Sequence, residues 1–72
     1  MVEKSDPLIE KLIQRLRDPD PVVRRNAAGA LRLHGRRARG AVGELRERLT
    51  DDDASVRAEA AKALDRLRQA AA

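Results

Sequence analysis

Few residues in this chain could take part in catalysis. His34 is its one histidine, and the chain contains no cysteine. A nucleophilic triad would need a hydroxyl or thiol that the fold places beside the imidazole. The two serines, Ser5 and Ser55, both stand at expected helix starts, where serine caps exposed amide groups. We therefore expect no catalytic residue, and we expect that the chain is not an enzyme.

Sites for metals and phosphates are equally weak. A metal ion held by one histidine would need carboxylates on the same helix face, and none is expected beside His34. The acidic run 51–53 resembles the start of a calcium loop in composition, but it lacks the central glycine and the terminal glutamate. Gly40 and Gly43 are not followed by the Lys-Ser/Thr pair of a phosphate loop. We expect no cofactor, metal or small-molecule substrate, and we interpret His34 as a half-buried histidine whose role stays open.

Arginine is the remaining residue type with chemical potential, and it is unevenly distributed. Residues 24–43 contain six arginines and no acid, although the net charge of the whole chain is only +4. Such a segment can attract nucleic acid or an acidic protein face, and a solvated arginine-rich helix surface is the simpler interpretation. The absence of aromatic residues argues against single-strand recognition, which depends on stacking. The candidate contacts to phosphates or to an acidic partner are Arg25, Arg32, Arg36, Arg37 and Arg39.

The elements that position these residues occur twice. Shifting the chain by 33 residues superimposes eleven identical pairs between residues 12–31 and 45–64. A period of this length is typical of solenoids, in which each unit buries its apolar face against its neighbour. The identical pairs are Leu12/Leu45, Arg15/Arg48, Leu16/Leu49, Asp18/Asp51, Asp20/Asp53, Val23/Val56, Arg24/Arg57, Ala27/Ala60, Ala28/Ala61, Ala30/Ala63 and Leu31/Leu64.

Capping signals divide the first unit into two helices. Asp6 followed by a proline predicts a first helix over residues 6–17, and Asp20 repeats that arrangement at the start of the second. Gly35 is expected to end the second helix in the left-handed conformation. Gly29 inside that helix costs about 1 kcal/mol relative to alanine. It marks either a neutral position or a close approach by another backbone.

The second unit is expected to follow the same plan. A third helix is predicted over residues 38–50, with a first half weakened by Gly43, and the acids of the run 51–53 favour the amino end of a fourth. Short connections make the paired helices antiparallel. The predicted fold class is all-α, a short α-solenoid of two helical hairpins with four helices.

The repeated Asp-x4-Val-Arg pattern, with its alanine-leucine tail, resembles HEAT repeat proteins in the short bacterial form also found in phycobilisome-lyase relatives. The pattern begins at Asp18 and again at Asp51, and the resemblance covers about residues 6–68. It implies one HEAT-like domain over residues 1–72, with repeat one at about 6–35 and repeat two at about 36–69. His34 departs from it, since the equivalent position in the second repeat is Leu67.

The resemblance also implies functional residues and a function. In that family the aspartate after the first helix and the arginine after the valine form a polar ladder between repeats. The matching positions are Asp18, Arg24, Asp51 and Arg57. We expect Arg24 to pair with the carboxylate of Asp51 or of Asp18, and Arg57 to pair with that of Asp51. The second helix of each hairpin would line the partner-binding surface. Enzymes among HEAT relatives use His-Glu metal pairs or aromatic side chains, which this chain lacks, so we expect a non-enzymatic protein-interaction module.

The composition predicts that one copy is not self-sufficient. Nearly half of the hydrophobic residues are alanine, and there is no Phe, Trp or Tyr, so the core is thin for a chain of 72 residues. Two repeats are also fewer than the three that solenoids usually need. We expect a homo-oligomer, formed as a closed pair through the first helix. Its candidate self-association residues are Leu8, Ile9, Leu12, Ile13 and Leu16.

The sequence leaves two alternatives to a protein-interaction module, and it also predicts where the protein is found. Weak electrostatic binding of nucleic acid by the arginine-rich segment 24–39 is the alternative function. A fragment or a designed minimal repeat without a ligand of its own is a further possibility. No apolar run approaches the roughly 20 residues of a membrane span, and no signal-peptide pattern opens the chain. We therefore expect a soluble cytoplasmic protein without membrane contact.

Overall fold

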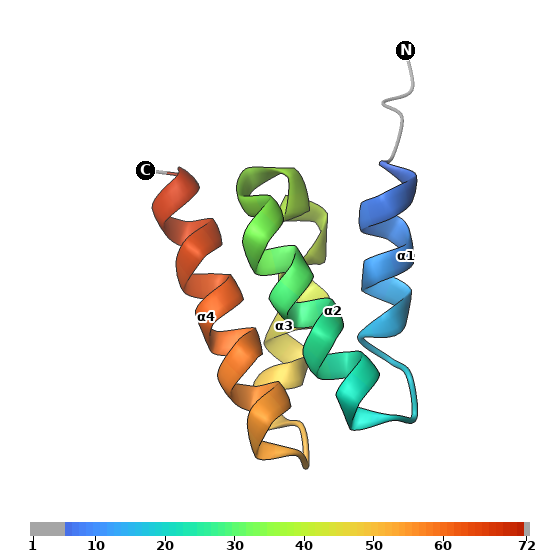
Figure 1. Cartoon of the computed structure of the whole chain (residues 1–72). Coiled ribbons are helices and arrows are strands. Elements are labelled where there is room, and N and C mark those ends of the chain that lie inside the picture. The colour runs from blue at the N-terminus through green and yellow to red at the C-terminus, as the bar shows by residue number, and fades with distance from the viewer. Residues whose placement is uncertain (1–5, 72) are drawn as a thin grey trace.

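The computed structural model describes residues 6–71, and helices arranged in two layers account for most of them (Figure 1). Helices α2 and α4 lie side by side in one layer, and α1, η1 and α3 form the other. No β-strand occurs within this range. The elements in chain order are α1 (Pro7–Arg15), α2 (Pro21–His34), the 3-10 helix η1 (Gly35–Ala41), α3 (Val42–Glu47), the 3-10 helix η2 (Arg48–Thr50) and α4 (Ala54–Ala71).

The helix starts follow from aspartate side chains. The Asp6 carboxylate accepts a hydrogen bond from the Leu8 amide at 3.0 Å, and Asp20 accepts one from Val22 at 2.9 Å. Both precede a proline at the first helical position, as the sequence predicted. The Asp53 carboxylate accepts from the first-turn amides of α4. Ser5, also expected at a helix start, lies outside the described residues.

The third predicted helix, over residues 38–50, is not a continuous α-helix. Only the six residues of α3 are α-helical, and 3-10 turns flank them on both sides. Ala38 has non-helical angles (φ −94°, ψ 17°), and no side chain caps the first amides of α3. Gly40 and Gly43 lower the helix propensity of the same stretch. The all-helical class is therefore confirmed, but the expectation of four full helices is met only in part.

The end of α2 also differs in detail from the expectation. Gly35 terminates the helix with a positive φ of 58°, which side-chain-bearing residues rarely adopt. Its ψ of −132° lies outside the left-handed helical region that was predicted for it. This region of backbone space is accessible almost only to glycine.

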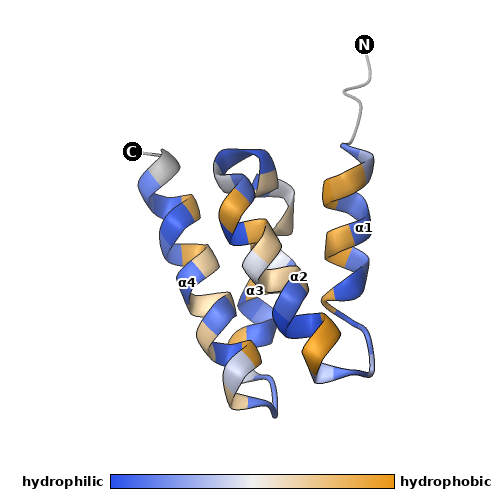
Figure 2. Cartoon of the chain, viewed as in Figure 1, coloured by the Kyte–Doolittle hydropathy of each residue, from blue (hydrophilic) through white to orange (hydrophobic). Residues whose placement is uncertain are grey.

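A small apolar core lies between the two layers. Alanine lets the helices approach closely, while a few leucines supply most of the buried area. Hydrophobic residues recur along α1 and α2 between hydrophilic ones (Figure 2). The core cluster consists of Ile9, Leu12, Leu16, Ala27, Ala28, Leu31, Ala38, Ala41, Leu45, Ala60, Ala63 and Leu67.

Candidate functional site

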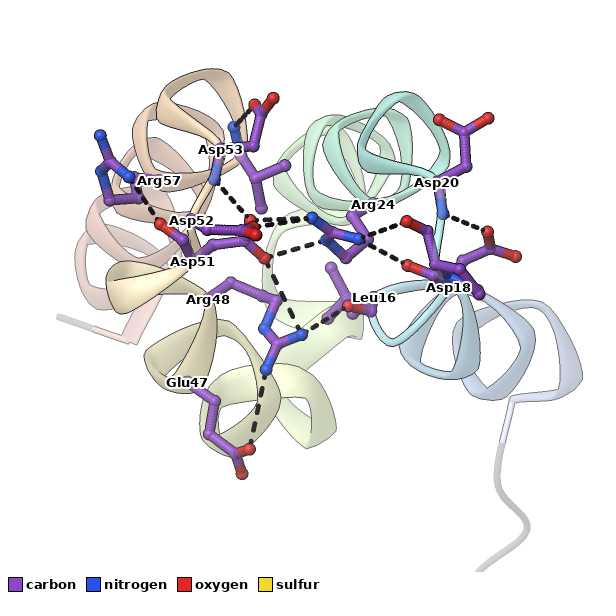
Figure 3. Close-up of polar contacts among 12 residues, drawn as sticks. Leu16, Asp18, Asp20, Arg24, Glu47, Arg48, Asp51, Asp52, Asp53 and Arg57 are labelled. Carbon is purple, nitrogen blue, oxygen red and sulfur yellow. Dashed lines mark hydrogen bonds and ion pairs between the residues drawn. The ribbon is translucent and has the colours of Figure 1, made fainter.

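Arg24 is the centre of a polar row that joins the two repeats (Figure 3). Its Nε donates to Oδ2 of Asp51 at 2.9 Å, and its Nη2 donates to Oδ1 of the same carboxylate at 3.0 Å. Its Nη1 donates to the carbonyl oxygen of Asp18 at 2.8 Å. The two side chains are largely buried, with 11% of Arg24 and 4% of Asp51 exposed. This two-pronged, charge-assisted contact fixes how repeat one sits on repeat two.

Charge compensation keeps the buried carboxylate ionised. Burial alone would raise the pKa of Asp51, but the Arg24 guanidinium and the backbone amide of Asp53 outweigh it and hold the pKa below its ordinary value. The same bond to Asp51 raises the pKa of Arg24. Asp52 also approaches Arg24, at 3.3 Å, but 95% of its side chain is exposed. Asp51 is therefore the principal partner of Arg24.

Arg57 occupies the equivalent place in repeat two, but its contacts differ from the expectation. We expected it to pair with the Asp51 carboxylate, whereas its Nη1 donates to the Asp51 carbonyl oxygen at 2.6 Å. That contact matches the one that Arg24 makes to the Asp18 carbonyl. Arg57 is exposed, and among the described residues no carboxylate pairs with it as Asp51 pairs with Arg24. In Figure 3, Asp18 and Arg57 lie at opposite ends of the row.

Arg48 is a member of this row that sequence reasoning missed. Its Nη1 donates to the carbonyl oxygen of Leu16 at 3.0 Å and lies 3.9 Å from Oδ2 of Asp51. The contact to Leu16 again joins repeat two to repeat one. The signal for it was present, since Arg15 and Arg48 form one of the identical pairs of the 33-residue repeat.

An apolar groove opens on the outer side of repeat two. It has a volume of about 590 Å³ and is formed by η1, α3, η2 and α4. We call it the α3–α4 groove. Its apolar lining residues, which we call its floor, are Val42, Leu49, Ala61, Leu64 and Leu67. Its charged lining residues, which we call its margin, are Arg39, Arg46, Asp65 and Arg68.

A second groove opens on the outer side of repeat one. It has a volume of about 500 Å³ and lies between α1 and α2, so we call it the α1–α2 groove. Its lining is a mixture of apolar and polar residues: Leu12, Arg15, Asp18, Val23, Asn26, Ala27 and Ala30.

The predicted self-association residues of α1 are mostly internal. Ile9, Leu12 and Leu16 are 4%, 6% and 0% exposed, because they pack against the chain's own core. Leu8 is 47% exposed and Ile13 is half-buried. The surface that α1 offers to another copy is therefore much smaller than the sequence pattern suggested.

The predicted basic contacts differ in their partners and surroundings. Arg32 lies 3.5 Å from Glu59, and Arg37 is ion-paired with Asp6. Arg39 belongs to the margin of the α3–α4 groove, whereas Arg25 lines a separate depression beside Gly29. Arg36 is exposed on η1.

Three remaining sequence features have simple structural positions. His34 is half-buried in the last turn of α2, and no group of three or more possible metal ligands occurs among the residues that the structure describes. Within the described residues, no backbone of another element lies close to Gly29. A Cβ at this position would have the Glu59 carboxylate as its nearest neighbour, at 3.5 Å. Within residues 6–71, no helix has both the length and the apolar character needed to cross a bilayer.

Comparison with known proteins identifies a family for nearly the whole chain. A family model described as HEAT repeats matches residues 9–72. Searches among curated proteins and among solved structures found no match.

Proposed function

Because the chain belongs to the HEAT repeat family, we propose that it is a non-enzymatic protein-interaction module that binds its partner through the α3–α4 groove. HEAT repeats commonly serve as protein-interaction modules, and the family is generally a scaffold rather than an enzyme. The observation that carries the proposal is an apolar groove of about 590 Å³ on a chain with few large apolar residues. An exposed apolar patch with a polar margin is typical of a protein-binding surface.

The form of the groove favours a helical protein surface as its occupant. Leu49 is 41% exposed and Leu64 is half-buried, so both side chains can lose further contact with water when a partner binds. Each large aliphatic side chain that becomes fully buried contributes about 1.5–3 kcal/mol. Arg39 and Arg46 at the margin can bind carboxylates from the polar side of an amphipathic helix, whereas Arg68 already donates to Asp65 at 2.7 Å.

Electrostatic binding of nucleic acid has no comparable support. The five candidate arginines are spread over α2 and η1, and two of them are ion-paired with acids of the chain itself. A phosphate-binding surface needs several free cations along one track. We therefore place the interaction in the apolar groove, with the basic residues as its margin.

Site-specific photo-crosslinking tests the proposed function. A photoreactive residue replaces Leu49 in the groove, and the matched control replaces Leu33, which is 77% exposed on α2 and lies outside the groove. We expect protein adducts from position 49 and few from position 33. The attached peptides, identified by mass spectrometry, should come from amphipathic helices. Equal labelling at the two positions, or no labelling at position 49, would reject the groove as the binding surface.

A further inference from the structure

We propose that the α3–α4 groove is covered by a second copy of this chain, which contacts it through the face that carries the α1–α2 groove. The two copies are joined head to tail, so that Arg57 of one copy binds Asp18 of the next. The proposal rests on the proposed function and names its partner. Its basis is the interface between the two repeats, which shows how such faces fit together.

The first observation is the contrast between equivalent apolar residues. In repeat one, Leu16 and Leu31 are fully buried, and α2 packs mainly against α4 of repeat two. Their counterparts in repeat two, Leu49 and Leu64, lie in the α3–α4 groove, and Leu49 is 41% exposed. The pairs Ile9/Val42 and Ala28/Ala61 show the same contrast. The α3–α4 groove is therefore the face of repeat two that corresponds to the covered face of repeat one.

The opposite contrast appears at the other end of the molecule. Val56 and Ala63 are fully buried where repeat two rests on repeat one. Their counterparts Val23 and Ala30 are only partly buried and line the α1–α2 groove. Two faces meet at the internal interface between the repeats. The chain therefore has an uncovered counterpart of each of these two faces, one in the α3–α4 groove and one in the α1–α2 groove.

The polar groups at the two ends are complementary in the same way. Arg24 Nη1 is held by the Asp18 carbonyl while its Nε and Nη2 bind the Asp51 carboxylate. Arg57 Nη1 is held by the Asp51 carbonyl, and no carboxylate within residues 6–71 binds its Nε and Nη2. At the other end, Asp18 Oδ1 accepts the Asp20 amide and no other donor of the described residues, just as Asp51 Oδ1 accepts the Asp53 amide beside Arg24. Arg57 at one end and the Asp18 carboxylate at the other are therefore the two partners of a possible ion pair between copies.

A second polar contact supports the same register. Arg48 donates to the Leu16 carbonyl across the internal interface. The equivalent residues are Arg15, which lines the α1–α2 groove, and Leu49, which lines the α3–α4 groove. Where Arg57 of one copy binds Asp18 of the next, the same docking brings Arg15 of that next copy to the Leu49 carbonyl of the first.

A closed pair made by joining two α3–α4 grooves fits less well. It would set a margin of three arginines and one acid, Asp65, against a copy of itself, and the excess of positive charge opposes association. It would also leave Asp18 outside the interface. The head-to-tail arrangement joins unlike faces, so it grows into an open chain of copies or closes into a ring.

A charge-swap experiment tests the register. We expect Arg57→Glu and Asp18→Arg each to weaken self-association by at least about tenfold, because each places like charges opposite one another. An equimolar mixture should recover the parent's association. At one junction the introduced glutamate of the first variant meets the introduced arginine of the second, and at the next junction the native pair forms. Solution mass is followed by light scattering with refractive-index detection, because the chain has no aromatic residue.

The outcomes separate this proposal from the proposed function. Circular dichroism of each variant establishes that it is folded, and recovery in the mixture shows it independently. If Asp18→Arg associates like the parent, or if the mixture stays as small as its components, the head-to-tail pair is wrong. Photo-crosslinks from position 49 to a different protein, with a monomeric parent, would overturn self-association while leaving the groove as the binding surface. If position 49 gives no crosslinks and the parent is monomeric, the self-association proposal and the proposed function are both wrong.

Discussion

At the scale of single residues, Asp51 has two simultaneous tasks. Its carboxylate holds Arg24 of the first repeat and also accepts the backbone amide of Asp53 in the turn before α4. A residue that joins an inter-repeat contact to a turn makes the two depend on each other. The neighbouring Asp52 is similar in charge and position, but its side chain is 95% exposed.

The difference between these two aspartates predicts different mutational effects. We expect Asp51→Ala to lower the free energy of unfolding by about 2 kcal/mol, because it leaves the largely buried Arg24 without its carboxylate partner. Asp52→Ala should change it by less than about 0.5 kcal/mol, as at an ordinary surface position. Urea unfolding of the two variants and the parent measures both values. Equal losses would mean that Asp51 has no special structural role.

The lowered pKa of Asp51 predicts acid sensitivity. In the unfolded chain this carboxyl titrates near the ordinary value of about 3.9, whereas in the folded state its pKa lies lower, so acid favours the unfolded state. The stabilisation is complete above about pH 5 and is lost progressively as the pH falls through the folded-state pKa.

Unfolding measurements between pH 7 and pH 3 test this contribution. Asp51→Asn removes the titrating group, so its stability should fall less steeply with acid than that of the parent. Parallel curves for the two proteins would assign the acid sensitivity to the other carboxyls with lowered pKa values, such as Glu44 beside Arg17.

Sequence reasoning at this scale identified residue types better than partners. The motif singled out Asp18, Arg24, Asp51 and Arg57, which all lie in the polar row. It assigned a carboxylate to Arg57, but in the second repeat the equivalent carboxylate would have to come from a third repeat. A pattern shows which residue takes part in a contact, whereas the partner depends on which neighbour is present.

At the scale of elements, the aspartate-proline starts of α1 and α2 were predictable because capping is a local interaction. The interruption of the predicted third helix was harder to foresee. Its apolar spacing is helical, but weak propensity and missing caps leave it divided between α and 3-10 turns. Periodicity indicates which residues face the core, and it says less about how regular the backbone between them is.

Two glycines in or after α2 are expected to respond oppositely to alanine. Gly29 has room for a Cβ, with only the Glu59 carboxylate at 3.5 Å, so Gly29→Ala should stabilise the protein by about 1 kcal/mol. Gly35 has a φ of 58° and a ψ of −132°, so Gly35→Ala should destabilise it by about 1 kcal/mol or more. Thermal unfolding measures both changes. A destabilised Gly29→Ala would show that the position needs glycine for another reason.

At the scale of the whole molecule, identical residues have opposite environments. Leu16 is fully buried and Leu49 is 41% exposed, although they occupy the same place in their repeats. The sequence alone predicts that both face a neighbour. It does not tell which of the two leucines has that neighbour within the chain. The sequence therefore predicted self-association through α1, whereas the exposed apolar surface in the structure is the α3–α4 groove.

Self-association through that groove predicts a melting temperature that rises with protein concentration. Any equilibrium that binds only the folded state stabilises it by mass action. Leu49→Glu should remove the concentration dependence, because it places a charge in the groove floor. The control Leu33→Glu changes a leucine that is more exposed, at 77%, and should retain it. The proposal fails at this scale if the parent melts at the same temperature over a hundredfold concentration range.

The placement of the chain ends has a consequence for building longer proteins from this one. The start of α1 and the end of α4 lie at the same edge of the molecule, which is also the edge where η1 connects α2 to α3 (Figure 1). In a tandem of two copies of this 72-residue sequence, residues 68–72 and 1–8 would stand between Leu67 of the first copy and Ile9 of the second. Inside the chain, the seven residues of η1 span the corresponding connection. A tandem gene therefore has enough linker to convert the contact between copies into a covalent one.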